Sequence, residues 1–500
     1  MKVLPHNIQN KRSIAIMKLP RNIQKRPNIA TMQKLPVEML LCIFKLLSYE
    51  DLKLIVLVCR RWREIGETPR LWSSFPVIVN KRNMSVMPEI LSSRRMEGLK
   101  KLRIETRLSK KVSQTIVRHT GLREFEISPR NKKQTITSVL SVISSRGCQG
   151  TNLKIEGNQM LGVDSGLLAR AVTKVEALNV TYTQLTQQQA GEILTAVSEG
   201  NRLTKLSISH NDLSGIEPEL LAKAVTKLEF LNVINTKLTQ QQVVAIFTAL
   251  SEENKLTELF ISENDLSQVD PELLYKAIVN LKILKVTETR LTKQQAVAIF
   301  TAVSEGREMT TLYIAGNDLS GVYSGLLVKA VTKLQVLHVM YTGVTQQQAV
   351  AILTAASEGS NLTKLYIRGN DLSGVDSALL TKVVTRLEEL LIGDTELTQQ
   401  QIADILTAVS EGNNLTKLDI SLSDLSEVDP NMLVKVVTKL QILIIICTKL
   451  TQKQIEAILS SISEESILTE LNMSCDCNKL PEVDPGLLQR AAQLLRNFSI

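Results

Sequence analysis

Apolar and polar positions alternate along this chain in two patterns, one typical of short strands and one typical of helices. Residues 203–213 read L-T-K-L-S-I-S-H-N-D-L, an alternation that leads into an Asn-containing turn. This pattern indicates a strand with one buried face. Residues 244–250 instead carry apolar side chains at every third position, at Val244, Phe247 and Leu250. That spacing predicts a helix with one face turned toward a core.

The strand pattern recurs with a period of 53 residues, and each period contains two halves of about 25 and 28 residues. The length of each half is typical of leucine-rich repeats, in which one strand is followed by one helix. We predict about 16 strands in all. The central strand leucines of the two kinds of half are Leu206, Leu259, Leu312, Leu365, Leu418 and Leu471, and Leu178, Leu231, Leu284, Leu337, Leu390 and Leu443.

Helix starts and turns carry their own signals. Thr239 followed by Gln242 forms a capping box, in which each side chain satisfies a free backbone N–H of the other residue. The Asp270-Pro271 pair places an acceptor at the cap and proline at the first helical position. An asparagine follows the first-half strands, where it is expected to satisfy backbone groups of adjacent turns. The other capping boxes are Thr186/Gln189, Thr292/Gln295, Thr345/Gln348, Thr398/Gln401 and Thr451/Gln454, and the asparagines are Asn158, Asn211, Asn264, Asn317 and Asn370.

Residues 35–75 do not follow the repeat. They predict three short helices, beginning near Pro36, after Ser48 and at Pro69. This segment holds both tryptophans of the protein and many Leu, Ile and Val residues. A piece of this size cannot bury so much apolar surface within itself, so an exposed apolar face and a partner are expected.

The same segment resembles the F-box motif in its opening L-P-x-E at 35–38, its V-C-R-R-W centre at 58–62 and its P-R-L-W close at 69–72. The resemblance implies docking to a Skp-family adaptor and, through it, to a cullin scaffold with a RING subunit. The alternative is an ordinary helical cap on the repeats. By resemblance, the residues that face the adaptor or support the facing helices are Leu35, Pro36, Ile43, Leu47, Leu52, Val58, Cys59 and Trp62.

Residues 99–500 resemble leucine-rich repeats of the ribonuclease-inhibitor type. The resemblance implies an α/β fold class: a curved solenoid with a parallel sheet on its concave face and helices on its convex face. The expected domains are a basic, disordered arm (1–34), an F-box (35–75), a linker (76–98) and the solenoid (99–500), whose repeats are clearest over 153–500.

Comparing the units with one another separates uniform from variable positions. The helical phrases barely change, whereas strand positions that point away from the helices vary freely, as expected of a binding surface. Parallel strands lie roughly 4.8 Å apart, so variable side chains on successive strands form one continuous row. Aromatic residues, Met and Arg are enriched at interface hot spots. We name as the aromatic stripe, and predict as the centre of target binding, Phe260, Lys285, Tyr313, His338 and Tyr366 with their neighbours Met340, Tyr341 and Arg368.

A simpler explanation of the aromatic stripe is strand propensity, because exposed strand positions favour aromatic residues in any case. Substituting Tyr313 and Tyr366 by alanine separates the two explanations through target capture.

No pair of nucleophile and base, no Gly-rich phosphate loop and no set of four metal ligands is evident in the sequence. We therefore expect no cofactor, no metal and no catalytic activity of its own.

The net charge of +9 is concentrated at the N-terminus. Residues 1–34 hold eight Lys and Arg and no acid, so the rest of the chain is nearly neutral. A nucleic-acid-binding fold would need a basic face, so we expect no nucleic-acid partner. The arm is interpreted as a disordered tail; a nuclear import signal, a contact with an anionic surface and a mitochondrial presequence are the alternatives, the last disfavoured by the prolines.

The six cysteines are scattered and no secretory signal precedes them, which predicts reduced thiols and a cytoplasmic or nuclear protein. No apolar run reaches the length of a membrane span. The leading hypothesis is a non-catalytic substrate receptor of a ubiquitin ligase that holds an unidentified protein target. The alternatives are a stand-alone leucine-rich-repeat inhibitor or sensor and a nucleic-acid binder that uses the basic arm.

Overall fold

The computed structural model divides into two compact units, Met1–Asp212 and Leu213–Ile500. The basic arm 1–34 lies outside the residues that the structure describes, and so do Cys148, Cys475 and Cys477. The described residues are 35–119, 121–145, 151–200, 202–252, 255–412, 414–474 and 483–499.

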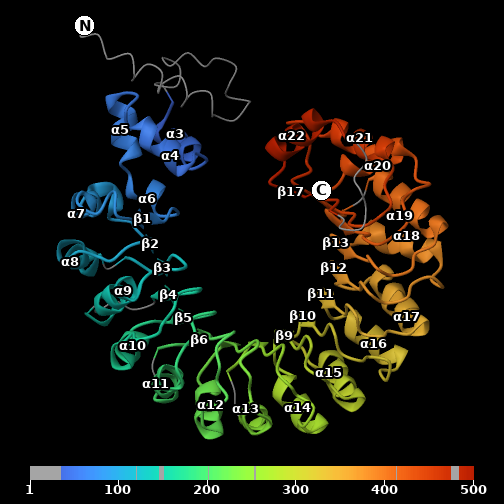
Figure 1. The fold of residues 1–500 in the computed structure, drawn as a ribbon, viewed down its shortest axis with the longest axis horizontal. Coiled ribbons are helices and arrows are strands. Elements are labelled where there is room, and N and C mark those ends of the chain that lie inside the picture. Colours follow the sequence, from blue (N-terminus) through green and yellow to red (C-terminus); the bar gives the residue numbers. More distant parts are fainter. Residues whose placement is uncertain are drawn as a thin grey trace. The chain divides into compact units, whose positions relative to one another are not determined.

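From residue 35 onward, where its description starts, the first unit has four short helices and continues with strands and helices in alternation (Figure 1). In chain order its elements are α3 (Val37–Phe44), α4 (Tyr49–Ile55), α5 (Arg60–Gly66), α6 (Pro69–Trp72), β1 (Val77–Val79), α7 (Met87–Leu91), η1 (Arg94–Met96), β2 (Lys101–Ile104), α8 (Lys110–Arg118), β3 (Glu124–Ile127), α9 (Lys133–Ser145), β4 (Asn152–Lys154), α10 (Ser165–Val172), β5 (Ala177–Asn179), α11 (Gln187–Ser198) and β6 (Lys205–Ser207).

The helices at the start of this unit begin where the sequence predicts, and one more is present. Pro36 precedes α3, Ser48 caps α4 by accepting the Asp51 N–H at 3.2 Å, and Pro69 opens α6. The additional helix is α5, whose N-cap is Cys59 in an extended conformation. A cysteine is an uncommon cap, so the start of α5 carries no signal of the usual Ser, Thr, Asp or Asn kind.

Strands β1 to β6 are parallel, and consecutive strands pair with each other in the sheet of this unit. The first of them, β1, lies in the segment 76–98, where we expected a linker. Its Val77 and Val79 are buried, and Val77 is in register with Leu102 of β2. The sheet therefore starts one strand earlier than the leucine pattern indicates.

The second unit repeats the helix and strand alternation more regularly. Its elements are α12 (Pro218–Val225), β7 (Phe230–Asn232), α13 (Gln240–Glu252), β8 (Glu258–Phe260), α14 (Pro271–Ile278), β9 (Ile283–Lys285), α15 (Lys293–Glu305), β10 (Thr311–Tyr313), α16 (Ser324–Val331), β11 (Val336–His338), α17 (Gln346–Ser357), β12 (Lys364–Tyr366), α18 (Ser377–Arg386), β13 (Glu389–Leu391), α19 (Gln399–Glu411), β14 (Lys417–Asp419), α20 (Pro430–Val437), β15 (Ile442–Ile444), α21 (Gln452–Ser461), β16 (Glu470–Asn472), α22 (Pro485–Leu494) and β17 (Asn497–Ser499).

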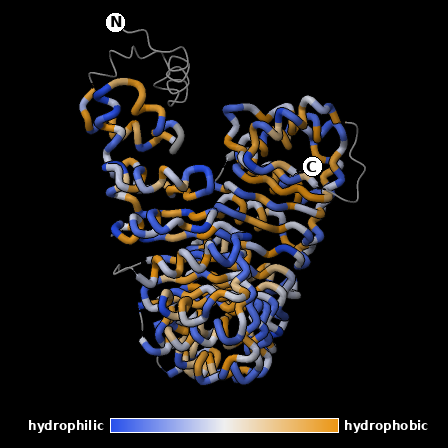
Figure 2. The backbone as a smooth tube through the Cα atoms, turned by 60° about the vertical axis from the view of Figure 1, so that its left-hand side comes forward, coloured by the Kyte–Doolittle hydropathy of each residue, from blue (hydrophilic) through white to orange (hydrophobic). Residues whose placement is uncertain are grey.

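Strands β7 to β17 form a parallel series in which every middle residue faces the middle residue of the next strand, as Leu284 faces Leu312. Within this unit the strands line the inner side and the helices the outer side of the chain's path (Figure 1). The strand leucines are buried against the helices. Hydrophobic and hydrophilic positions alternate closely along the backbone (Figure 2), as expected when each element buries one face only.

Two ladders of buried amides join neighbouring halves. Asn317 donates to the carbonyls of Val286 and Ile314 at 2.7 and 2.9 Å, which confirms the expected role of the turn asparagine. Gln295 closes the predicted capping box with Thr292. Its amide nitrogen also donates to carbonyls of the preceding turn, so the glutamine joins two halves in addition to capping a helix.

Candidate protein-interaction surfaces

The helices over residues 35–75 divide their apolar side chains between an inside and an outside. Four of the residues predicted to contact or support an adaptor are buried: Leu47, Leu52, Val58 and Trp62. The other four are accessible, with Pro36 exposed and Leu35, Ile43 and Cys59 half-buried. The first group lies in the core of these helices, and the second group reaches their surface.

Trp62 occupies the centre of the buried group. Its ring meets the Phe44 ring edge to face at a centroid distance of 5.2 Å, and only 4% of the residue is exposed. Trp72 is buried as well, and its indole nitrogen donates to the Gly66 carbonyl at 2.7 Å. The two tryptophans therefore account for part of the core and not for the accessible surface.

An apolar surface nevertheless remains on α3 and the turn that follows it. Met39, Ile43 and Leu46 are spaced four and three residues apart, which places them on one side of the helix. Met39 is 52% exposed and Leu46 is 72% exposed. Leu57, after α4, is 45% exposed. Met39, Leu46 and Leu57 are not among the residues predicted to contact an adaptor, because the motif marks recurring positions and does not tell which of them point outward.

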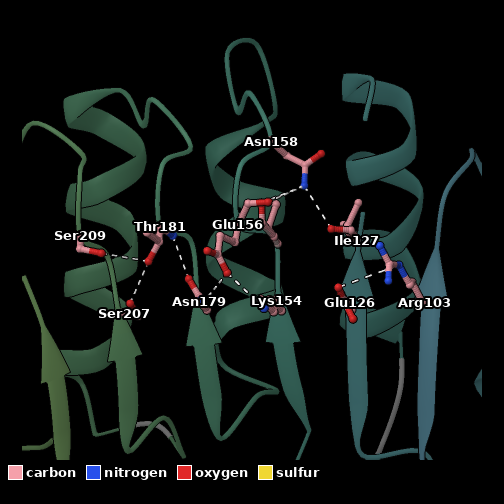
Figure 3. Close-up of polar contacts among 11 residues, drawn as sticks. Arg103, Glu126, Ile127, Lys154, Glu156, Asn158, Asn179, Thr181, Ser207 and Ser209 are labelled. Atoms are coloured by element: carbon pink, nitrogen blue, oxygen red, sulfur yellow. Dashed lines mark hydrogen bonds and ion pairs between the residues drawn. The ribbon is translucent and has the colours of Figure 1, made fainter. Parts of the chain in front are cut away.

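The sheet face of the first unit is polar, and its side chains satisfy one another (Figure 3). Lys154 and Glu156 form an ion pair at 3.2 Å, and Asn179 donates to the same carboxylate at 3.3 Å. The Thr181 hydroxyl hydrogen-bonds to the hydroxyl of Ser207 at 2.9 Å. This face therefore presents few polar groups that still need a partner.

The aromatic stripe of the second unit is different in character. The structure brings its first five residues into one row, because each is in register with the next on strands β8 to β12. The Lys285 ammonium lies over two rings, at 4.2 Å from the Phe260 centroid and 4.4 Å from the Tyr313 centroid. The His338 ring contacts those of Tyr313 and Tyr366 at 5.0 and 4.7 Å. All five side chains are half-buried.

Burial sets the charge states along the row. It lowers the pKa of His338 to about 4, with help from the positive charges of Lys285 and Lys417, so this imidazole is neutral at pH 7. Its Nδ1 atom is buried and has no hydrogen-bond partner within the part of the chain that the structure describes. Burial also lowers the pKa of Lys285.

Tyr366, at the β12 end of the row, is hydrogen-bonded to a carboxylate. The Tyr366 hydroxyl donates to the Glu389 carboxylate at 2.6 Å, and Lys364 pairs with the same group. Burial raises the pKa of Tyr366, and the hydrogen bond to Glu389 raises it further. Burial alone would raise the pKa of Glu389, but the hydrogen bonds from Lys364 and Tyr366 outweigh it, and the pKa is lowered.

The remaining stripe residues lie beside the row. Arg368 donates to the Tyr341 hydroxyl at 2.9 Å and pairs with the buried carboxylate of Asp419 at 3.5 Å. Tyr341 is 49% exposed and donates in turn to Asp394 at 3.3 Å. Met340 is half-buried. Five of the eight predicted residues therefore form one row, Tyr341 and Arg368 contact each other, and Met340 follows His338 by two residues.

Four further residues complete this surface, and the sequence analysis did not assign them. Phe230 on β7 meets Phe260 edge to face at 5.1 Å. The other three are the acids Glu389, Asp394 and Asp419. Phe230 and Glu389 lie directly before a central strand leucine, whereas the first five residues of the aromatic stripe lie directly after one. Comparing the units at the position before the leucine would have found both residues.

The cysteine prediction needs a correction. Cys42 and Cys59 are free thiols, but Cys447 is disulfide-bonded, so the expectation that all six are reduced is wrong at that position. Across the described ranges, no three His, Cys, Asp or Glu residues group in a way that could hold a metal ion. No helix of those ranges combines the length and the apolar character needed to cross a bilayer.

Comparison with known proteins gives two family matches. Residues 32–75 match the F-box-like family, and residues 202–224 match the Leucine Rich Repeat family. Among solved structures, the leucine-rich repeat-containing protein LegL7 from Legionella pneumophila aligns with a TM-score of 0.33 and 14% identity, covering 67% of this chain and 96% of that one.

Curated relatives are similar over about half of this chain. "NACHT, LRR and PYD domains-containing protein 3" of Bos taurus is 27% identical over 278 residues, which cover 51% of this chain and 27% of the relative. "NACHT, LRR and PYD domains-containing protein 13" of Homo sapiens is 26% identical over 206 residues, covering 40% and 19%. The chain thus spans about a quarter or less of the length of these relatives. The two family matches and the parallel strand series show that this chain joins an F-box-like domain to a series of leucine-rich repeats.

Proposed function

We propose that this protein is the substrate-recognition subunit of a Skp adaptor–cullin–F-box ubiquitin ligase. In this role the F-box-like helices bind the adaptor, and the aromatic stripe binds a protein target. The chain supplies no catalysis of its own and raises the local concentration of the target near the site of ubiquitin transfer. The proposal places the protein in the cytoplasm or the nucleus.

The observation that carries the adaptor half of the proposal is the apolar surface left on a domain of the F-box-like family. Met39, Leu46 and Leu57 remain between 45% and 72% exposed although Trp62 and Phe44 are enclosed. Exposed apolar patches of this kind are typical of interaction sites. The buried residues Leu47, Leu52, Val58 and Trp62 hold the helices that present this surface.

Co-purification tests the adaptor half. Tagged intact chain is expressed in cells, and adaptor and cullin are measured in the recovered complex by quantitative mass spectrometry. Leu46→Asp and Leu57→Asp should each abolish recovery, because a carboxylate on the contact surface must be desolvated. Leu161→Asp is the matched control, since Leu161 is 71% exposed, as Leu46 is 72% exposed, but lies outside the domain. Circular dichroism should give the same unfolding midpoint for all the variants.

The target half predicts a double dissociation. Tyr313→Ala/Tyr366→Ala should keep the adaptor and lose the target, whereas Leu46→Asp should keep the target and stop its ubiquitylation. Tyr323→Ala is the control for the first variant, because Tyr323 is 61% exposed and lies outside the aromatic stripe. A protein that responds in both ways is the target. If no protein does so, the receptor role is wrong.

The second candidate function is a leucine-rich-repeat binding, inhibitor or sensor protein without coupling to ubiquitin ligation. The similarity to NACHT, LRR and PYD domains-containing proteins favours it, because by name those relatives combine such repeats with other domains. The co-purification experiment separates the two candidates. Failure of the intact chain to recover adaptor would support the second, and the aromatic stripe would keep its proposed role in binding.

A further inference from the structure

The position of Lys285 in the aromatic stripe is unusual for a lysine. Its ammonium lies between the rings of Phe260 and Tyr313, at 4.2 and 4.4 Å from their centroids, and the side chain is half-buried. The faces of both rings are negative and attract a cation. The two rings restrict the long side chain to one place on the sheet surface, so part of its conformational entropy is already lost before any partner binds.

This charge is not neutralised by an acid. Among the residues that the structure describes, no carboxylate lies within ion-pairing distance of the Lys285 ammonium, and Glu258 acts on it only from farther away. Two other cations beside the row differ in this respect. Lys364 pairs with Glu389, and Arg368 pairs with Asp419 at 3.5 Å.

The groups around Lys285 would cooperate with an incoming acceptor. The Tyr313 hydroxyl makes no hydrogen bond within the described ranges, so it is free to donate. His338 is neutral at neutral pH and does not add a second positive charge. Lys285 is therefore a cation without an ion-pair partner among the described residues, and it lies beside one neutral donor and two aromatic rings.

We propose that Lys285 is the anchor for one carboxylate, an aspartate or glutamate side chain of the target, which is flanked there by apolar residues. The inference rests on the proposed target-binding role of the aromatic stripe and does not depend on adaptor docking. A phosphate is the less suitable ligand, because phosphate sites in proteins are typically built from several cations, most often arginines. The apolar residues that flank this acid in the target would lie on Phe260 and Phe230 at one side and on Met340 at the other.

A peptide selection tests the inference without knowledge of the target. The intact chain is immobilised and challenged with a phage-displayed library of random 12-residue peptides. Selected peptides are synthesised in their acidic form, with the acid changed to its amide, and with phosphoserine in its place. Their affinities are measured by fluorescence anisotropy against the wild type and three variants: Lys285→Met, which keeps the stem on the rings without the charge, Lys329→Met as an exposed control on α16, and Tyr313→Ala/Tyr366→Ala.

The expected result is enrichment of Asp or Glu at one position beside apolar residues. Lys285→Met should weaken the acidic peptide about tenfold, the usual scale for a hydrogen-bonded charge, and Lys329→Met should leave it unchanged. The amide peptide should bind weakly to the wild type and lose nothing further in Lys285→Met.

Other results overturn the inference in distinguishable ways. Peptides that lose affinity with Tyr313→Ala/Tyr366→Ala but not with Lys285→Met would leave the stripe as the target site and remove the carboxylate anchor. Peptides that respond to neither variant, or the absence of any enriched peptide, would remove both. A phosphoserine peptide that binds more tightly than the acidic one through Lys285 would replace the carboxylate by a phosphate.

Discussion

Gln295 provides the sharpest test of how the repeats are held together. The side chain is buried, with 1% exposure. Its carbonyl oxygen accepts the Thr292 N–H at 2.8 Å, and its amide nitrogen donates to the carbonyls of Leu266 at 2.8 Å and Val269 at 2.6 Å. The perturbation is Gln295→Ala, which removes all three bonds and keeps the helix-forming backbone of α15.

The loss of stability in Gln295→Ala follows from the backbone groups that lose a hydrogen-bond partner. The Leu266 carbonyl still accepts the Val269 N–H at 2.9 Å, so it loses one of two bonds. The Thr292 N–H and the Val269 carbonyl lose the side chain that satisfied them. A buried group without a hydrogen bond costs about 1 to 3 kcal/mol, and a lost bond with a remaining partner costs about 1 kcal/mol or less. We therefore expect Gln295→Ala to lower the free energy of unfolding by about 3 kcal/mol.

The assay is urea unfolding of the intact chain followed by circular dichroism, with hydrogen exchange at the start of α15 to locate the loss. Repeat arrays can depart from two-state unfolding, so the transition midpoint and the slope are both compared. Gln294→Ala is the matched control, because Gln294 is the adjacent residue of the same helix turn and is exposed. Its effect should stay within about 0.5 kcal/mol. If the two variants were equally stable, the buried glutamine ladder would not be a stabilising element.

Three smaller perturbations test the stripe. His338 takes up a proton near pH 6.5 in the unfolded chain, whereas the pKa of His338 in the folded chain is about 4, so the free energy of unfolding should fall as the pH drops from 6.5 toward 4. After a discount for the partial exposure of this side chain, the wild type should lose about 1 kcal/mol more stability than His338→Gln between pH 7 and pH 5, as measured by urea titration. Tyr366→Phe should cost about 1 kcal/mol by breaking the bond to Glu389, while Tyr313→Phe, which breaks no hydrogen bond, should be neutral in thermal melts. Gly369→Ala, at φ +71° with its new methyl against the Tyr341 ring, should lower the melting temperature more than Gly359→Ala, at φ +99° in open space; equal shifts would mean that Tyr341 is not held in place.

Much of this protein can be predicted from periodicity alone. The capping boxes at Thr292 and Thr345 form as expected, because a capping box needs only neighbouring residues. The burial of the central strand leucines is also a local property, because the alternation of apolar and polar positions decides which face of a strand meets the core. The start of α5 and the strand β1 were missed because Cys59 and Val77 do not carry the usual cap or leucine signals.

The row formed by the aromatic stripe could be predicted, because a fixed period places equivalent positions side by side on parallel strands. The partners of its members could not, because they lie 23 or more residues away in sequence, as with Tyr366 and Glu389, and depend on side-chain reach and direction. The same holds for the F-box-like domain, whose motif marks both Trp62 and Ile43 without telling that one is enclosed and the other accessible.

The order of apolar and polar residues by itself determined the repeating strand and helix units, because burial of one face per element is a local property. The tertiary structure decided which charges are neutralised. Arg368 reaches the buried Asp419 across two strands, and Lys364 reaches Glu389, whereas Lys285 stands between two rings with no acid in reach among the described residues. That difference depends on distances of a few ångströms between strands, and periodicity in the sequence carries no information about them.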